Sequence, residues 1–148
     1  MNSELFLFLY KEISQESEGR AFSQVKTTYL KKLPLRYIEN EVLRTIYKYL
    51  TVLYAFSEDH INTTFFTSIT NSIIYELYFP EEIKSAGKEI LKHLGDLKPI
   101  TDDMSEEEKL AIIQSEFERL YDPNHPVRFA IETLDSVEEV RIIKEALK

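Results

Sequence analysis

The chain has 148 residues, of which 43% are hydrophobic and 12% aromatic, with no cysteine and a net charge of −8. This length and composition suit one folded domain and exclude intrinsic disorder, a disulfide scaffold, a thiolate zinc site and a cysteine nucleophile. No apolar run approaches the length of a membrane span and no signal peptide is recognisable, so we expect a cytoplasmic protein.

The first part of the chain predicts one helix followed by extended chain. Leu5, Phe8 and Leu9 stand at helical spacing, which predicts a helix over residues 3–13. Residues 20–36 then mix β-branched, aromatic and basic side chains around Pro34, a composition typical of extended or short β structure. We therefore distinguish residues 1–38 from a helical part, residues 39–148, and expect both to form one compact unit.

From residue 41 onward the periodicity is helical. Apolar residues recur every three or four positions over residues 41–56 and again over residues 61–79, with a polar break at residues 57–60. Pro80 and the two glutamates after it predict the first turn of another helix. This helix is predicted to end at Gly95 and to place four residues inward: Ile83, Ala86, Ile90 and Leu94.

Two capping boxes mark helices in the last third of the chain. In each, a serine hydroxyl and a glutamate three residues later satisfy each other's free amides. Ser105 with Glu108 predicts the start of a helix through residue 121, and Ser136 with Glu139 predicts a last helix through residue 147. Residues 122–126 contain two prolines and predict a turn, followed by a short helix over residues 127–134. The predicted fold is mainly α, a bundle-like domain of five or six helices.

The charges are uneven along the chain. Residues 19–38 carry five basic and no acidic side chains, whereas the other residues carry 13 basic and 26 acidic ones. Within residues 20–36, here called the basic stretch, cations and hydroxyl donors alternate with aromatic residues, a pattern suited to phosphate contacts. The candidate DNA-binding residues are Arg20, Lys26, Thr27, Thr28, Lys31, Lys32 and Arg36. The simpler interpretation is that these cations only balance an acidic domain.

Catalytic and metal-binding patterns find little support. The three glycines stand alone, so there is no glycine-rich phosphate loop, and the three histidines lack metal-ligand spacing. Glu82 and Lys84 have the Glu-x-Lys spacing of metal-dependent nucleases, with Glu76 or Asp59 as an upstream acid, but in a helix their side chains diverge. We expect no catalytic residue, metal or cofactor in the chain, and leave open whether it works within an enzyme.

Several segments resemble one family, in matching order. The resemblance begins with NSELF at residues 2–6 and GRAFSQVKTTYLKKLPL at residues 19–35. These runs resemble the end of the recognition region in TaqI-like adenine-specific DNA methyltransferases, where a helix beginning LNS precedes AFPQ(V/I)K and LKKLPI. Ser23 replaces the usual proline and Leu35 the usual isoleucine. Three further runs resemble the C-terminal tails of combined restriction–methyltransferase polypeptides (type IIG): IYELYF at 74–79, FERLYDP at 117–123 and HPVR at 125–128.

The resemblance implies absences as well as functions. Such enzymes bind S-adenosylmethionine through a glycine-containing motif and hold the flipped adenine with an (Asn/Asp)-Pro-Pro-(Tyr/Phe) motif, and neither motif occurs here. The resemblance thus implies the C-terminal part of a type II restriction–modification enzyme, beginning inside the recognition region at residues 1–38. Its implied partners are duplex DNA, bound weakly by this chain alone, and the catalytic methyltransferase or recognition domain of the parent enzyme, with no membrane.

Three function hypotheses follow from the sequence. The first is a non-catalytic DNA-recognition and scaffold module whose basic stretch lies on phosphates. The second is a protein-interaction or assembly domain without DNA contact, which the net negative charge and the aromatic-rich helix at residues 61–79 favour. The third is a free-standing metal-dependent nuclease, for which only Glu82 and Lys84 argue.

Overall fold

The computed structural model describes residues 3–14 and 40–148, which are mainly helical with no strand among them. The predicted mainly α class is confirmed. The extended segment predicted near residues 20–36 and the boundary predicted at residue 38 lie outside the described residues. Within the described part of the chain, no helix is long and apolar enough to cross a membrane.

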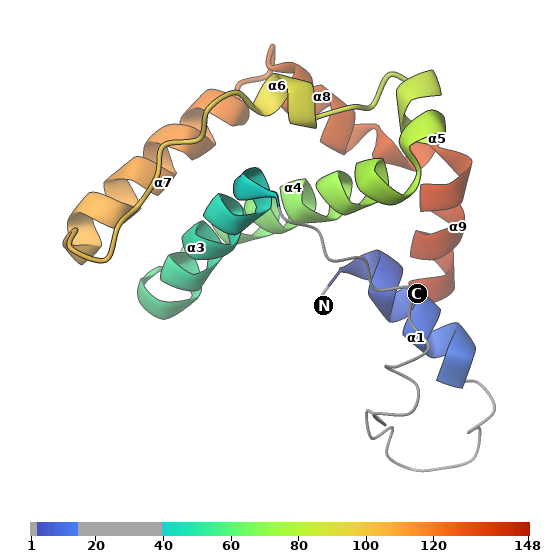
Figure 1. The fold of residues 1–148 in the computed structure, drawn as a ribbon, viewed down its shortest axis with the longest axis horizontal. Coiled ribbons are helices and arrows are strands. Elements are labelled where there is room, and N and C mark those ends of the chain that lie inside the picture. The colour runs from blue at the N-terminus through green and yellow to red at the C-terminus, as the bar shows by residue number, and fades with distance from the viewer. Residues whose placement is uncertain (1–2, 15–39) are drawn as a thin grey trace.

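The elements follow one another as drawn in Figure 1. Their bounds are α1 Glu4–Ser14, α3 Glu41–Phe56, α4 His60–Tyr78, α5 Pro80–Ser85, α6 Leu91–Leu94, α7 Glu106–Leu120, α8 Pro126–Glu132, the 3-10 turn η2 Leu134–Ser136 and α9 Glu138–Leu147. The helix α4 runs through the middle of the molecule with α3 alongside it, and α1 lies beside α9 at the other end (Figure 1). The helix α4 contacts α1, α3, α5, α7 and α8, which makes it the central element of the fold.

Side-chain caps explain why α3 and α4 begin where they do. The side chain of Asn40 accepts hydrogen bonds from the amides of Val42 and Leu43, at 2.9 and 3.2 Å. Asp59 does the same for the first amides of α4, beginning with Ile61 at 2.9 Å. Each cap satisfies amides that have no partner inside the helix, typically stabilising it by about 1 kcal/mol.

Two clusters of buried apolar side chains hold the helices together, and α4 contributes to both. The first core lies among α3, α4, α7 and α8 and includes Ile46, Phe66 and Ile113, all fully buried. The second core joins α1, α5 and α9 to the end of α4 and includes Leu5 and Val140. Burying such a side chain contributes about 1.5–3 kcal/mol, so these clusters are the main stabilising contribution to the fold.

The helix predicted to run from residue 80 to residue 94 is divided into α5 and α6. α5 ends at Ser85 because Gly87 has a φ of 66° and its amide, with that of Lys88, donates to carbonyls of the last turn. This is a Schellman motif, which needs the left-handed conformation that glycine adopts readily. Ala86 is consequently exposed, not inward as predicted. The fully buried apolar residues of this region are Ile83, Ile90 and Leu94.

The first predicted capping box is present and the second is not. The Ser105 hydroxyl accepts from the Glu108 amide at 3.2 Å, and the Glu108 carboxylate accepts from the Ser105 amide at 2.7 Å. Ser136 instead belongs to η2, and α9 begins one residue later with Val137 as its N-cap and no side-chain cap bond. Val137 is buried in the second core, and its burial takes precedence over a capping serine at this position.

Candidate nucleic-acid interface

The predicted DNA-binding residues all lie outside the described residues. They are Arg20, Lys26, Thr27, Thr28, Lys31, Lys32 and Arg36. The structure does describe the elements on either side of the basic stretch, which are α1 before it and Asn40 with α3 after it. The contacts of these two flanks show how the helical part anchors the residues on either side of the basic stretch.

The N-terminal flank, α1, is fixed to two other helices by hydrogen bonds. The Glu4 amide donates to the side-chain oxygen of Asn71 in α4 at 3.1 Å, and the Tyr75 hydroxyl donates to the Glu4 carboxylate at 3.0 Å. Burial raises the pKa of the Tyr75 phenol far above its ordinary value, and the Glu4 carboxylate raises it further. Lys11 donates from Nζ to the Ala146 carbonyl of α9 at 2.6 Å.

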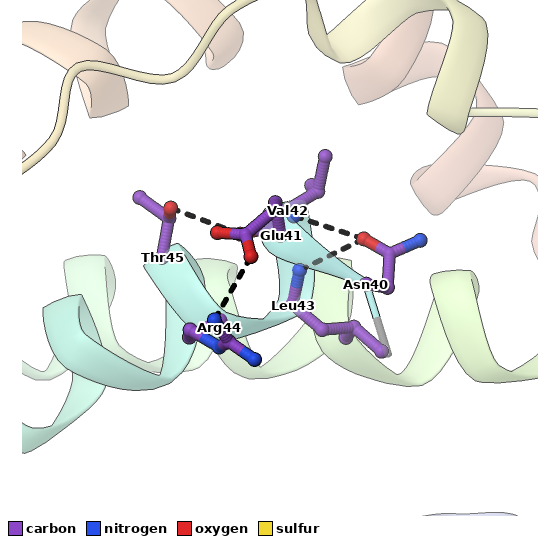
Figure 2. Close-up of polar contacts among 6 residues, drawn as sticks. All are labelled: Asn40, Glu41, Val42, Leu43, Arg44 and Thr45. Atoms are coloured by element: carbon purple, nitrogen blue, oxygen red, sulfur yellow. Dashed lines mark hydrogen bonds and ion pairs between the residues drawn. The ribbon is translucent and has the colours of Figure 1, made fainter. Parts of the chain in front are cut away.

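The C-terminal flank is the first turn of α3, shown in Figure 2. Besides the Asn40 cap, the Arg44 guanidinium lies 2.9 Å from the Glu41 carboxylate, and the Thr45 hydroxyl donates to the Glu41 carbonyl at 3.0 Å (Figure 2). The acidic residue sits at the positive end of the helix dipole, where it is stabilising. The first turn of α3, which begins just after residues 15–39 in the sequence, is thus well capped.

The structure also has a pocket of about 400 Å³ between the start of α4, the end of α7 and α8. The Tyr121 ring forms part of its wall and packs edge-on against Phe65, with ring centroids 5.1 Å apart. The Arg128 guanidinium lies 4.1 Å from the centre of the Tyr121 ring, and its Nε donates to Glu132 at 2.8 Å. The hydrogen bond with Glu132 raises the pKa of Arg128. The wall is mainly apolar and carries a few polar groups, as binding pockets commonly do.

The aromatic-rich helix that favoured a docking role is largely part of the core. Phe66 and Tyr75 are fully buried and Phe65 is only 6% exposed. Ile61, in the first turn of α4, is the exception at 63% exposed, and it lines the pocket. Sequence periodicity alone did not indicate this pocket, because its walls come from helices distant in the sequence.

The residues considered for a nuclease site have other roles in the structure. Glu82 and Lys84 are exposed on α5. Glu76 accepts hydrogen bonds at 2.8 and 3.1 Å from the two amides that begin α6, and Asp59 caps α4. Among residues 3–14 and 40–148, no group of three His, Asp or Glu side chains is placed to share a metal ion.

No protein-family model, curated protein or solved structure matches the chain. The resemblance to restriction–methyltransferase polypeptides therefore rests on the motifs quoted above. Those at 74–79, 117–123 and 125–128 lie around the end of α4, the end of α7 and the start of α8. They supply packing and capping groups: Phe117 stacks on Tyr121 with ring centroids 4.7 Å apart, and His125 caps α8.

Proposed function

We propose that this chain is a non-catalytic DNA-recognition and scaffold module, related to the C-terminal part of a type IIG restriction–modification enzyme. Its basic stretch contacts the phosphates of duplex DNA. Its helical part holds that stretch and packs against the catalytic methyltransferase or recognition domain of the parent enzyme. Acting on DNA beside such an enzyme, it works in a prokaryotic cytoplasm and needs no cofactor of its own.

The observation that carries the proposal is the fixation of both flanks of the basic stretch on one helical body. On one side, Glu4 is hydrogen-bonded to Asn71 and Tyr75 of α4. On the other side, Asn40 caps α3, whose inner face lies in the first core. A binding segment held at both ends loses less conformational entropy on binding than a free tail does.

The distribution of charge supports the same proposal. The basic stretch carries five cations and no acid, and all 26 acidic residues lie elsewhere in the chain. Such segregation orients one surface toward a polyanion and repels the rest. The module alone should bind DNA weakly, at the non-specific level of about 10⁻⁴–10⁻⁶ M at physiological salt.

The test compares charge variants of the whole chain in low-salt titrations with labelled duplexes of several sequences. Lys31→Ala/Lys32→Ala should weaken binding to every duplex alike, because phosphate contacts carry no sequence information. Lys84→Ala/Lys92→Ala removes the same charge from exposed positions in α5 and α6 and should bind like the parent. Equal losses of DNA affinity in both variants would mean that the cations of the basic stretch only balance the acidic charge of the chain.

A second candidate function, a protein-interaction or assembly domain, is favoured by one observation. The pocket beside α4 is mainly apolar, and the exposed side chains of Ile61 and, on α3, Tyr54 and Phe56 lie on the helices that flank the α3–α4 turn. Contiguous exposed apolar patches often mark protein-binding sites, and this candidate function requires these side chains to form such a patch. This function predicts no DNA binding even at low salt, so the same titration separates the two candidates.

A further inference from the structure

We propose that the exposed face of α3 is a second DNA-contacting surface, which continues the basic stretch onto the helical body. The inference deepens the proposed function and rests on it, because both surfaces would contact the same duplex. It is carried by the pattern of exposed residues on α3, by the charge of this helix and by its position in the chain.

The pattern on α3 divides the helix into two faces. The inner face lies in the first core and includes Ile46, Tyr49 and Leu53, each 1% exposed or less. The outer face consists of exposed residues that recur at helical spacing: Arg44, Tyr47, Lys48, Thr51 and Tyr54. Tyr47 is 46% exposed and Tyr54 is 72% exposed, so both present a phenol ring and its hydroxyl to solvent.

The charge of α3 sets it apart from the other long helices. It carries two cations, Arg44 and Lys48, against one acid, Glu41, which lies in its first turn. Every other described helix of ten residues or more carries more acidic than basic side chains. In a chain of net charge −8, α3 is therefore the described long helix whose charge is best matched to a polyanion.

The groups on this face are those that contact DNA phosphates. Arginine, lysine and tyrosine side chains all donate hydrogen bonds to phosphate oxygens. Arg44 and Tyr54 are ten residues apart on the helix, which spans about 15 Å. That length corresponds to about four base pairs of duplex. The ion pair of Arg44 with Glu41 is solvent-exposed, and exposed ion pairs contribute only about 0–1 kcal/mol.

The basic stretch and α3 are also neighbours in the sequence. Arg36, the last cation of the basic stretch, precedes the capping residue Asn40 by four residues. Asn40 fixes the start of α3, as Figure 2 shows, and Arg44 follows one turn later. The cations of the basic stretch and those of α3 thus follow one another within a few positions of the sequence.

The variant Arg44→Ala/Lys48→Ala in the whole chain tests the inference. Alanine favours the helix, so α3 should persist, which circular dichroism checks. Removing two phosphate-binding side chains should weaken binding to all duplexes, and raising salt from about 50 to about 200 mM should cost the parent about tenfold more affinity than the variant. The control Lys84→Ala/Lys92→Ala is matched, because Lys92 pairs with Glu89 at i,i+3 just as Arg44 pairs with Glu41.

A spectroscopic readout keeps the test independent of fold stability. The chain contains no tryptophan, so Tyr54→Trp introduces a single reporter at an exposed site. Its fluorescence should change when duplex is added, and the change should reverse at high salt. A fluorescence signal that does not change with duplex overturns the inference. So does an Arg44→Ala/Lys48→Ala variant that binds like the parent while Lys31→Ala/Lys32→Ala binds weakly. Both outcomes leave the proposed function standing. A parent chain that does not bind duplex overturns both.

Discussion

The Tyr75 hydroxyl in α4 and the Glu4 carboxylate in α1 are joined by a hydrogen bond of 3.0 Å, across 71 positions of the sequence. Tyr75 is fully buried in the second core, and its hydroxyl reaches the start of α1. The helix that precedes the basic stretch is thereby fixed to the central helix of the fold. The stability of this link should be measurable separately from the stability of the whole domain.

Tyr75→Phe should destabilise the chain by about 0.5–1.5 kcal/mol, the usual net contribution of one hydrogen bond. Glu4 is half-buried and can regain solvent when its partner is removed, so a larger loss is not expected. Urea unfolding measures the change, and amide hydrogen exchange should show faster exchange in α1. Tyr54→Phe removes an exposed hydroxyl and serves as the control. Equal stability of both variants would contradict a structural role for the Tyr75–Glu4 bond.

The cap of α8 should make stability depend on pH. Nδ1 of His125 accepts a hydrogen bond from the Val127 amide at 3.2 Å. Nδ1 can accept only while the imidazole is neutral. Burial lowers the pKa of His125, and the nearby positive charge of Arg119 lowers it further. Because the pKa is lower in the folded state, the contribution is fully present above the unfolded value of about 6.5 and is lost as pH falls through the folded pKa.

His125→Asn supplies a capping oxygen that does not titrate. The free energy of unfolding of the parent should fall more steeply between about pH 7 and about pH 5 than that of the variant, because only the parent loses this cap. Chemical denaturation at both pH values measures the difference. Parallel pH profiles would show that His125 does not couple the cap to protonation.

The residue that ends α6 should tolerate no side chain. Gly95 has φ 65° and ψ −162°, a conformation that is essentially restricted to glycine. A Cβ at Gly95 would lie 3.7 Å from Nη1 of Arg119, an ordinary contact, so the cost of Gly95→Ala comes from backbone strain. We expect a loss of about 1–3 kcal/mol in denaturation experiments. A neutral substitution would mean that the backbone here relaxes into another conformation.

An ion pair beside Gly95 provides a double-mutant test. Glu116 is only 2% exposed, and its carboxylate lies 2.7 Å from the Arg119 guanidinium. The substitution Arg119→Met removes this partner. The guanidinium also donates to the Leu94 carbonyl at 2.8 Å. Arg119→Met should cost about 1–3 kcal/mol by leaving a buried carboxylate without its partner. Adding Glu116→Gln should recover part of that loss, because the charge is then removed as well. A purely additive double variant would argue against coupling of the two side chains.

Local signals in the sequence predicted most helix boundaries. The Ser105–Glu108 box forms as predicted because no tertiary contact competes with it on an exposed surface. At Ser136 the same pattern fails, since burial of Val137 shifts the start of α9. The prediction followed the apolar periodicity through residue 94 and did not use Gly87, whose left-handed conformation ends α5. Periodicity thus predicts the elements well and their ends less well where glycine or the core intervenes.

Contacts between residues distant in the sequence were less predictable. Glu76 caps α6 from α4, fourteen residues away from Ile90, and no local motif indicates such a bond. The pocket combines Tyr121 and Arg128 with the first turns of α4, which only the tertiary arrangement brings together. The outer face of α3 was readable in principle, because its exposed tyrosines and cations follow the helical period. It becomes distinctive only once the structure shows which face is buried.

The central claim is that the chain binds duplex DNA through phosphate contacts of the basic stretch, and the salt dependence of its affinity tests this most directly. Two to four phosphate contacts should give a plot of log affinity against log salt a slope of about −2 to −4. Lys31→Ala/Lys32→Ala should flatten that slope by about one unit for each phosphate that the variant no longer binds, whereas Lys84→Ala/Lys92→Ala should leave it unchanged. No binding at low salt, or the same slope in all three proteins, would contradict the claim.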